Sequence, residues 1–156
     1  MGQYNNIPQG WMETSLGELI DIYNQKRIPL STQVRNSRQG IYPYYGASNI
    51  VDYIDDYIFD GEFLLISEDG ENLNTRNTPI AFIAKGKFWV NNHAHIVKGK
   101  SEHLTKYLEL YFSKLDISAF ITGAVQPKLS KGNLVNIPIL ISESSKEQKA
   151  IAKVLT

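Results

Sequence analysis

Histidines and carboxylates near the middle of the chain are the residues whose types and spacing could carry metal or catalytic chemistry. His93 and His95 stand two positions apart, so on a strand both would project from one face and could share a metal ion. A zinc site needs further ligands, and the sequence identifies no third one. Asn92 and His93 suit hydrogen bonding in a polar groove equally well, so we expect no metal site here.

Acids at Glu68, Asp69 and Glu71 offer a second kind of chemistry, because paired carboxylates can hold a divalent cation in a nuclease. Nucleases of this kind also use a nearby lysine, which this run of acids lacks. Residues 99–101 imitate the end of a phosphate-binding loop, but Ala94 stands where that motif requires glycine. The sequence therefore favours binding over catalysis.

Polar side chains gathered in a few loops suit a different task, the reading of DNA. Asn, Gln, Arg and Lys can hydrogen-bond base edges in the major groove, while other Lys and Arg bind phosphates. Loops are ordinarily rich in such residues, so no single one is specific. The candidate DNA-binding residues are Lys26, Arg27, Arg35, Arg38, Asn72, Asn74, Arg76, Asn91, Asn92, His93, Gln126 and Lys128.

The composition is that of one globular domain. The chain has 156 residues, of which 42% are hydrophobic and 21% charged, and it has no cysteine. Disulfides and thiolate ligands are therefore excluded, and the longest apolar runs are too short to span a bilayer. We expect a cytoplasmic protein without membrane contact.

Charge is balanced overall but uneven along the chain. The net charge is zero, which counts against strong non-specific DNA binding, because Lys and Arg usually supply much of that affinity. Residues 52–71 contain eight acids and no Lys or Arg, whereas residues 76–100 contain five basic residues and no acid. The segregation could give one face a positive and another a negative potential, but solvated loops are the usual explanation of such charge runs and the one that we favour.

Strands dominate the predicted structure in the middle of the chain. Residues 41–66 alternate Tyr, Ile, Val and Phe with turn residues, which predicts short strands. Further strands are expected at 80–84, 88–90, 93–97 and 137–141, with Lys85, Gly86 and Lys87 as a turn.

Helices are expected on both sides of this β-rich centre. Apolar residues from Leu104 to Leu115 repeat at helical spacing, which predicts a helix that backs the sheet. Thr14 or Ser15 can cap a short helix that begins near Leu16, and a turn or short helix is expected around residues 130–134.

A last helix is predicted at the C-terminus, because Ser145 followed by Gln148 forms a capping-box pattern. It either docks back on the domain or opens a longer helix, and we expect the second. Its candidate subunit-docking residues are Gln148, Ile151, Val154 and Leu155.

Several blocks of the sequence resemble the specificity subunit of type I restriction-modification systems. The matching blocks are residues 42–48, 55–70, 91–95, 123–129 and 137–138, with borders at Trp11, 16–19 and 147–152. Together they cover nearly the whole chain, and the combination is specific to that family.

The resemblance implies an α+β fold: a single mixed α/β target-recognition domain with a twisted β-rich centre and a backing amphipathic helix. It places that domain at residues 1–142 and the start of a spacer helix at residues 143–156. In the family, the domain reads one half of a bipartite target in double-stranded DNA. The spacer helices dock modification subunits.

The resemblance also assigns the chemistry to other chains. A modification subunit binds S-adenosylmethionine and methylates adenine, and a restriction subunit joins the complex for ATP-driven translocation and cleavage. The chain itself is therefore expected to hold no catalytic centre and no cofactor, with S-adenosylmethionine, ATP and Mg²⁺ belonging to its partners.

Three other functions fit parts of the sequence. A recognition domain from another restriction or methyltransferase type would share these loops. A metal-dependent nuclease would use Glu68 and Asp69. A protein-interaction module would show no salt-dependent DNA binding at all.

Overall fold

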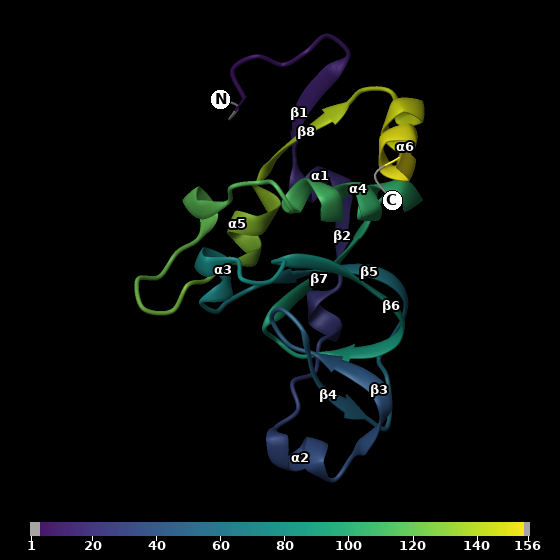
Figure 1. Cartoon of the computed structure of the whole chain (residues 1–156), viewed down its shortest axis with the longest axis vertical. Helices are drawn as coiled ribbons and strands as arrows, with labels where there is room; N and C mark the ends of the chain where they lie inside the picture. The colour runs from purple at the N-terminus through teal and green to yellow at the C-terminus, as the bar shows by residue number, and fades with distance from the viewer. Residues whose placement is uncertain (1–3, 155–156) are drawn as a thin grey trace.

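The structure is a computed structural model that describes residues 4–154 as a curled sheet with helices packed around it (Figure 1). The strands are β1 (Trp11–Ser15), β2 (Ile20–Ile22), β3 (Gln39–Tyr45), β4 (Ile50–Ile54), β5 (Phe59–Ser67), β6 (Ala81–Val90), β7 (Ala94–Gly99) and β8 (Pro138–Ser142). The helices are α1 (Leu16–Leu19), α2 (Thr32–Asn36), α3 (Asn72–Thr75), α4 (Glu102–Phe112), α5 (Lys131–Val135) and α6 (Ser145–Val154), with 3-10 turns η1 (Asn24–Lys26) and η2 (Ser118–Phe120). The predicted α+β class is confirmed.

Six strands form the main sheet in the order β2-β7-β5-β6-β3-β4, and β1 pairs with β8 in a separate two-stranded ribbon. Neighbouring strands are antiparallel, except that β3 and β6 pair in parallel over a short stretch. The central position of β5 explains its composition, because residues 63–67 are all buried.

The predicted turn at Lys85, Gly86 and Lys87 is wrong, because β6 runs through it without a break. Gly86 lies opposite Gly61 of β5, and their φ angles are +83° and +146°. L side chains rarely adopt such angles, so this glycine pair lets the two strands bend together. The bend helps the sheet to curl, and the curl brings the end of β6 round towards the end of β5.

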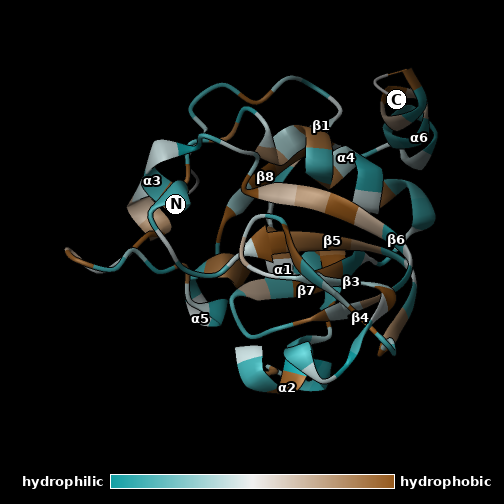
Figure 2. Cartoon of the chain, turned by 60° about the horizontal axis from the view of Figure 1, so that its bottom comes forward, coloured by the Kyte–Doolittle hydropathy of each residue, from teal (hydrophilic) through white to brown (hydrophobic). Residues whose placement is uncertain are grey.

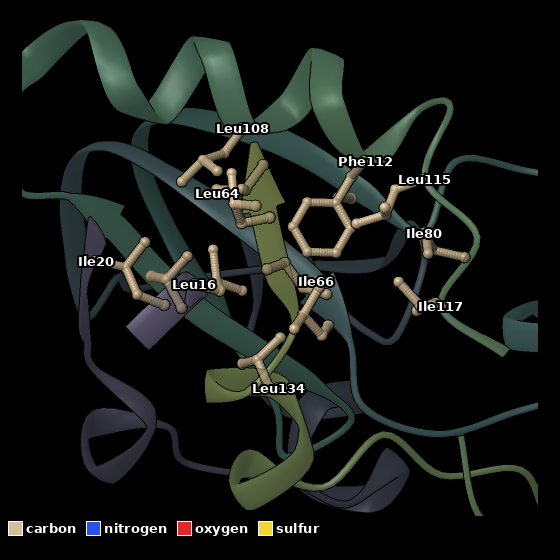
Figure 3. Packing of buried hydrophobic residues seen from close by; sticks show 14 of the residues in the cluster. Leu16, Ile20, Leu64, Ile66, Ile80, Leu108, Phe112, Leu115, Ile117 and Leu134 are labelled. Carbon is tan, nitrogen blue, oxygen red and sulfur yellow. The ribbon is translucent and has the colours of Figure 1, made fainter. Parts of the chain in front are cut away.

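The main hydrophobic core lies between α4 and the sheet (Figure 3). Leu108 and Phe112 point from α4 towards Leu64 and Ile66 of β5, and all four are fully buried. Each such side chain contributes about 1.5–3 kcal/mol when it leaves water. The amphipathic helix predicted to back the sheet is therefore confirmed.

A second core fills the inside of the curl. Phe59, Phe63 and Phe88 are buried there with ring centroids 5.5–5.9 Å apart. Aromatic pairs at such distances attract beyond simple area burial.

Two tyrosines of α4 also hold β8 in place. Tyr107 donates its hydroxyl to the carbonyl oxygen of Leu140 (2.8 Å), and Tyr111 accepts the backbone N–H of the same residue (2.9 Å). Burial and the neighbouring Tyr111 raise the pKa of Tyr107 to about 12, so this donor stays protonated.

Helix caps differ in detail from the predicted ones. Ser15 precedes α1, but its side chain makes no capping bond. At α6 the capping oxygen belongs to Ser144, whose Oγ accepts the backbone N–H of Glu147 (3.2 Å), one residue before the predicted Ser145. Gln148 is thereby freed to donate to the carbonyl oxygen of Ser142 (2.6 Å).

Helix α6 lies back against α4, so its described residues, 145–154, dock on the domain. The expectation that it also opens a longer helix stays a prediction. His103 of α4 lies 2.8 Å from the Gln148 side-chain oxygen, and Ala152 is buried. Within residues 4–154, no helix is long and apolar enough to cross a membrane.

Candidate nucleic-acid interface

Five loops gather near the end of β5 and form one surface, here named the loop edge. The loop edge comprises residues 24–27, 46–49, 68–72, 91–93 and 122–128. The backbone N–H of Glu68 donates to the carbonyl oxygen of His93 (2.9 Å), and that of Gly70 donates to Pro127 (3.0 Å). Because the loops bond to one another, the side chains that they carry are held in fixed relative positions.

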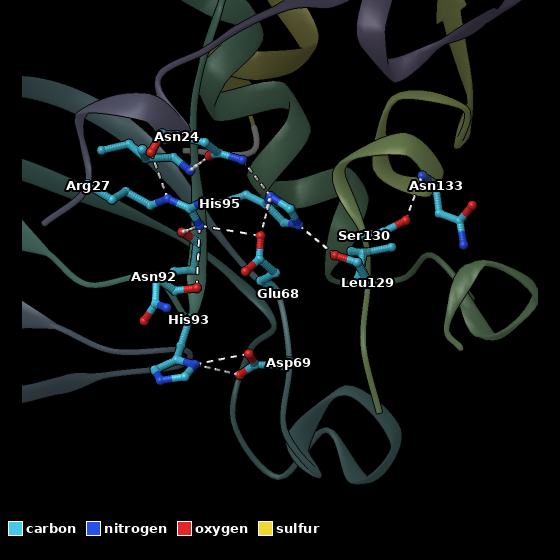
Figure 4. Close-up of polar contacts among 12 residues, drawn as sticks. Asn24, Arg27, Glu68, Asp69, Asn92, His93, His95, Leu129, Ser130 and Asn133 are labelled. Atoms are coloured by element: carbon cyan, nitrogen blue, oxygen red, sulfur yellow. Dashed lines mark hydrogen bonds and ion pairs between the residues drawn. The ribbon is translucent and has the colours of Figure 1, made fainter. Parts of the chain in front are cut away.

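His95 is fully buried beneath the loop edge and links three of its segments (Figure 4). Its Nε2 lies 2.7 Å from the carbonyl oxygen of Leu129, which can only accept, so Nε2 carries the proton. Its Nδ1 lies 2.9 Å from the side-chain nitrogen of Asn24, whose oxygen accepts the backbone N–H of Ile96 (3.0 Å). The imidazole is therefore neutral, and burial lowers its pKa.

An ion pair lies beside this histidine. Arg27 Nη1 is 3.3 Å from Glu68 Oε1 and 3.0 Å from the carbonyl oxygen of Ala94, and Arg27 Nε donates to Asn24 (2.9 Å). Glu68 Oε1 also lies 3.5 Å from His95 Nδ1, but an unprotonated nitrogen makes no ion pair at that distance. These contacts join η1 to the start of β7 and to the end of β5.

A second contact between a basic and an acidic side chain lies at the surface. His93 Nδ1 lies 2.9 and 3.0 Å from the two carboxylate oxygens of Asp69, and about half of the His93 side chain is exposed. Unlike His95, this imidazole can meet a ligand in solvent.

Residues 122–128 form a projection, here named the finger (Figure 1). Thr122 and Lys128 pair backbone to backbone at its base, with N–O distances of 2.8 and 2.9 Å. Gly123 has φ +89°, and a Cβ there would collide with the carbonyl oxygen of Gln126. Pro127 is buried, so the finger is a tight hairpin packed on the body at its root.

The predicted DNA-binding residues divide into two groups. The exposed members, free to meet a ligand, are Lys26, Asn74, Asn92, His93, Gln126 and Lys128. They lie on the loop edge, except that Asn74 lies next to it in α3. Contact of these residues with DNA stays a prediction.

Three other predicted residues belong to the loop edge but bond within the chain. Arg27 does so as described, Asn72 donates to Thr78 (3.0 Å), and Asn91 accepts the backbone N–H of His93 (2.8 Å). These bonds fix the loops, and contact of the three residues with DNA stays a prediction.

Arg35 and Arg38 lie away from the loop edge, on the lobe formed by α2, β3 and β4 (Figure 1). Arg35 pairs with Asp52 (3.0 Å), and the Tyr53 backbone N–H, helped by this guanidinium, lowers the pKa of the Asp52 carboxyl. Arg38 pairs with Asp55 (3.0 Å). Both arginines tie the loop around α2 to β4.

Arg76 is also structural. It has φ +50°, and its guanidinium donates to the carbonyl oxygens of Phe112 and Leu115, each at 2.5 Å. The last carbonyls of a helix have no partner inside the helix, so this side chain completes the end of α4.

The contacts of the charged residues argue against a positive face and a negative face. The acids of residues 52–71 pair with bases from other parts of the chain: Asp52 and Asp55 with Arg35 and Arg38, and Glu62 with Lys85 (3.5 Å). Antiparallel pairing of β5 with β6 brings an acidic strand against a basic one, so charges segregated in sequence are mixed in space.

The described residues, 4–154, hold no group of three or more histidines and acids arranged to bind a metal ion. His93 lies in the loop before β7 and is close to Asp69, whereas His95 lies within β7 and is close to Glu68. The two histidines therefore have different acidic neighbours. Glu68 and Asp69 are both engaged in contacts with basic groups, which removes support from the nuclease alternative.

The candidate subunit-docking residues predicted on the last helix differ in burial and in bonding. Gln148 bonds within the domain, and Ile151 is half-buried against the core. Val154 is exposed, with 82% of its surface accessible, and Leu155 lies outside the described residues. Ile151 and Val154, with Glu147 and Ala150, line a shallow apolar hollow of about 330 Å³ on α6.

Sequence reasoning missed Asn24 and Val125, and it gave His95 no role beyond a possible ligand. The one signal for His95 was its place within an apolar strand, where a polar side chain needs partners. No sequence pattern marks Asn24, because its partners lie 71 and 72 residues away. Val125 stands out only in the structure, where it is 93% exposed.

Comparison with known proteins places this fold in a family. The model of the type I restriction modification DNA specificity domain matches residues 8–156. A relative from Haemophilus influenzae, named as a type I restriction enzyme specificity subunit, is 41% identical over 140 residues. Those residues are 90% of this chain but 35% of the relative, so the chain spans about a third of that protein.

Solved structures share the fold at low sequence identity. The S subunit of a type I restriction-modification system from M. genitalium matches 99% of this chain and 40% of its own, with TM-score 0.73 and 16% identity. The HsdS subunit from Thermoanaerobacter tengcongensis matches 99% of this chain and 38% of its own, with TM-score 0.57 and 17% identity. This chain belongs to the family of type I restriction-modification DNA specificity domains.

Proposed function

We propose that this chain reads one half of a bipartite DNA target for a type I restriction-modification complex. The observation that carries the proposal is the loop edge, where exposed polar side chains project from loops that are bonded to one another and to the buried His95. A sequence reader needs this combination, because base contacts require adaptable polar groups held in a preset arrangement.

The proposal assigns chemistry to partners and only recognition to this chain. A modification subunit would bind S-adenosylmethionine and methylate adenine within the target, and a restriction subunit would cleave with ATP and Mg²⁺. The exposed Val154 and the apolar hollow on α6 are the features best suited to dock a modification subunit. Gln148 is less suited to that role, since its amide already bonds to Ser142 and His103.

A domain exchange tests the proposal. Residues 1–156 replace one recognition domain of a complete specificity subunit, the hybrid is expressed with its modification subunit, and methylated adenines are mapped across the host genome. We expect one half of the methylated bipartite motif to change while the other half stays.

A hybrid that assembles with its modification subunit, yet keeps the old motif or methylates without sequence preference, would overturn the proposal. The chain would then act as an interaction module. A second exchange that carries Asn92→Ala and Gln126→Ala serves as the matched variant, because both side chains are exposed on the loop edge. It should assemble equally well but relax the new half of the motif.

A further inference from the structure

The outer end of the finger is apolar, which is unusual on a surface otherwise rich in polar groups (Figure 2). Val125 is 93% exposed, the highest value among the large hydrophobic side chains of residues 4–154. A single exposed hydrophobic residue is ordinary by itself. Its position at the end of a projection, beside the exposed polar residues Gln126 and Lys128, is what calls for an explanation.

The finger is held in one shape. Gly123 adopts a φ of +89° that suits glycine, and the paired Thr122 and Lys128 close the hairpin below it. Thr122 Oγ1 adds a further bond to the carbonyl oxygen of Lys128 (3.4 Å). The tip is therefore presented by a short loop that the single bridge between Thr122 and Lys128 closes.

The root of the finger is fastened to the buried part of the loop edge. Gly70 donates its backbone N–H to Pro127 (3.0 Å), Leu129 donates to Glu68 (2.7 Å), and His95 donates to Leu129 (2.7 Å). Those bonds set the direction in which the tip points. A side chain on such a base meets a partner with little loss of freedom.

Residues beside the tip are suited to DNA. Gln126 is exposed next to Val125 and carries both a donor and an acceptor, and Lys128 is an exposed cation two residues further on. The major groove is wide enough to admit an α-helix, so a loop closed by one bridge can enter it, and each thymine displays there a 5-methyl group that apolar side chains contact.

We propose that Val125 reads the 5-methyl group of a thymine in the major groove, with Gln126 bonding an adjacent base edge and Lys128 a phosphate. This inference rests on the proposed function and names the residue that reads one position of the half-site. Insertion between base pairs in the minor groove is the competing use of an apolar tip. The side chains used for that purpose include Phe, Leu, Ile and Met, which all reach further than Val.

Deoxyuridine provides the test, because it differs from thymine only by lacking the methyl group. The half-site mapped with the hybrid subunit is made as a set of duplexes in which each thymine is replaced, one at a time, by deoxyuridine. Affinities of the hybrid complex are measured with the natural chain, with Val125→Ala and with Val34→Ala. Val34 is also exposed but lies in α2, away from the loop edge.

We expect binding to depend on the methyl group of one thymine in the half-site. Its replacement should weaken binding by the natural chain about fourfold, which corresponds to the burial of one methyl group. Val125→Ala should weaken binding to the unmodified duplex by a similar factor. The variant should bind the deoxyuridine duplex as tightly as it binds the unmodified one. Val34→Ala should keep the full sensitivity of the natural chain.

Two results would overturn the inference while the proposed function stands. In the first, the natural chain binds the half-site, but no single replacement of thymine by deoxyuridine weakens its binding. Alternatively, Val125→Ala can weaken every duplex by the same factor, which points to insertion or general contact. Failure of the hybrid to acquire any new half-site is a different outcome, because it removes the proposed function and this inference with it.

Discussion

The buried imidazole of His95 has a single arrangement of hydrogen bonds open to it. Leu129 offers only an acceptor to Nε2, and Asn24 is oriented by its bond from Ile96 so that it offers a donor to Nδ1. A protonated ring would place an N–H against the Asn24 N–H group. The three segments that meet at His95 are therefore joined by a neutral histidine.

Replacement of His95 by alanine should lower the free energy of unfolding by about 3 kcal/mol. The change leaves a cavity and deprives the buried Leu129 carbonyl and Asn24 amide of a partner. Urea denaturation measures the effect, and His93→Ala is the matched control two residues away. Because His93 is exposed, its loss should change stability by less than about 1 kcal/mol. Equal effects at the two positions would contradict the role given to His95.

Stability should also depend on pH through His95. Burial lowers its pKa, Arg27 lowers it further, and the Leu129 carbonyl, Glu68 and Asp69 oppose this without reversing it. Below about pH 6.5 the unfolded chain takes up a proton on this ring while the folded chain does not. The stabilisation is therefore complete above that pH and is lost as the pH falls towards the lower native pKa, by up to about 1.4 kcal/mol per pH unit.

Unfolding measured between pH 7.5 and about 5.5 checks this prediction. The natural chain should lose stability across that range more steeply than His95→Ala, which has no imidazole at this position. Parallel slopes for the two chains would show that other groups carry the pH dependence.

At the scale of elements, the sequence predicted well wherever one periodic pattern had a single interpretation. The stripe from Leu104 to Leu115 identified α4 and its buried face, since the helix packs on the sheet along that stripe. Lys85, Gly86 and Lys87 were misread because a glycine between lysines is typical of a turn. The register with Gly61 on β5, which only the folded sheet supplies, makes the same residues a bend within a strand.

The candidate site was less predictable for a related reason. Arg35, Arg38 and Arg76 have the composition of DNA contacts, but partners 17 to 39 residues away occupy them. The sequence shows which loops are polar, and it does not show which polar groups the fold uses itself. Gln126 and Lys128 remained available because the finger extends beyond such partners.

The shape of the finger depends on Gly123. Gly123→Ala should disturb it, because the φ of +89° strains any L side chain and the new Cβ would collide with Gln126. We expect the hybrid subunit to fold and assemble but to lose methylation at its new half-site by roughly tenfold or more, because a displaced finger forfeits at least one pair of base contacts.

Gly132→Ala is the matched control for this change. Gly132 lies in α5, and a Cβ there would meet only Ser130 Oγ, at an ordinary contact distance of 4.0 Å, so alanine should leave methylation intact and raise stability by about 0.5–1 kcal/mol through its better helix propensity. Genome methylation mapping and thermal unfolding separate the two variants. Equal loss of methylation in both would show that shape at the finger is not what matters.

For the whole molecule, balanced charge sets the kind of DNA binding that is possible. Sixteen basic and sixteen acidic residues cancel, and the ion pairs described above occupy several of the arginines. The exposed lysines on or next to the loop edge are Lys26, Lys128 and Lys131. Glu71 is also exposed there and would repel phosphate. Most of the affinity must then come from base contacts and from the rest of the complex.

Binding of the isolated chain to DNA should therefore depend only weakly on salt. Each neutralised phosphate adds about −0.9 to the slope of log K against log salt, so three lysines predict a slope no steeper than about −3. Lys128→Ala should flatten the slope by about one unit and weaken all sequences alike, whereas Gln126→Ala should leave the slope unchanged and relax one position. Anisotropy titrations between 50 and about 200 mM salt provide the measurement. A slope far steeper than this, insensitive to Lys128, would mean that another face of the molecule binds the phosphates and that the loop edge is not the interface.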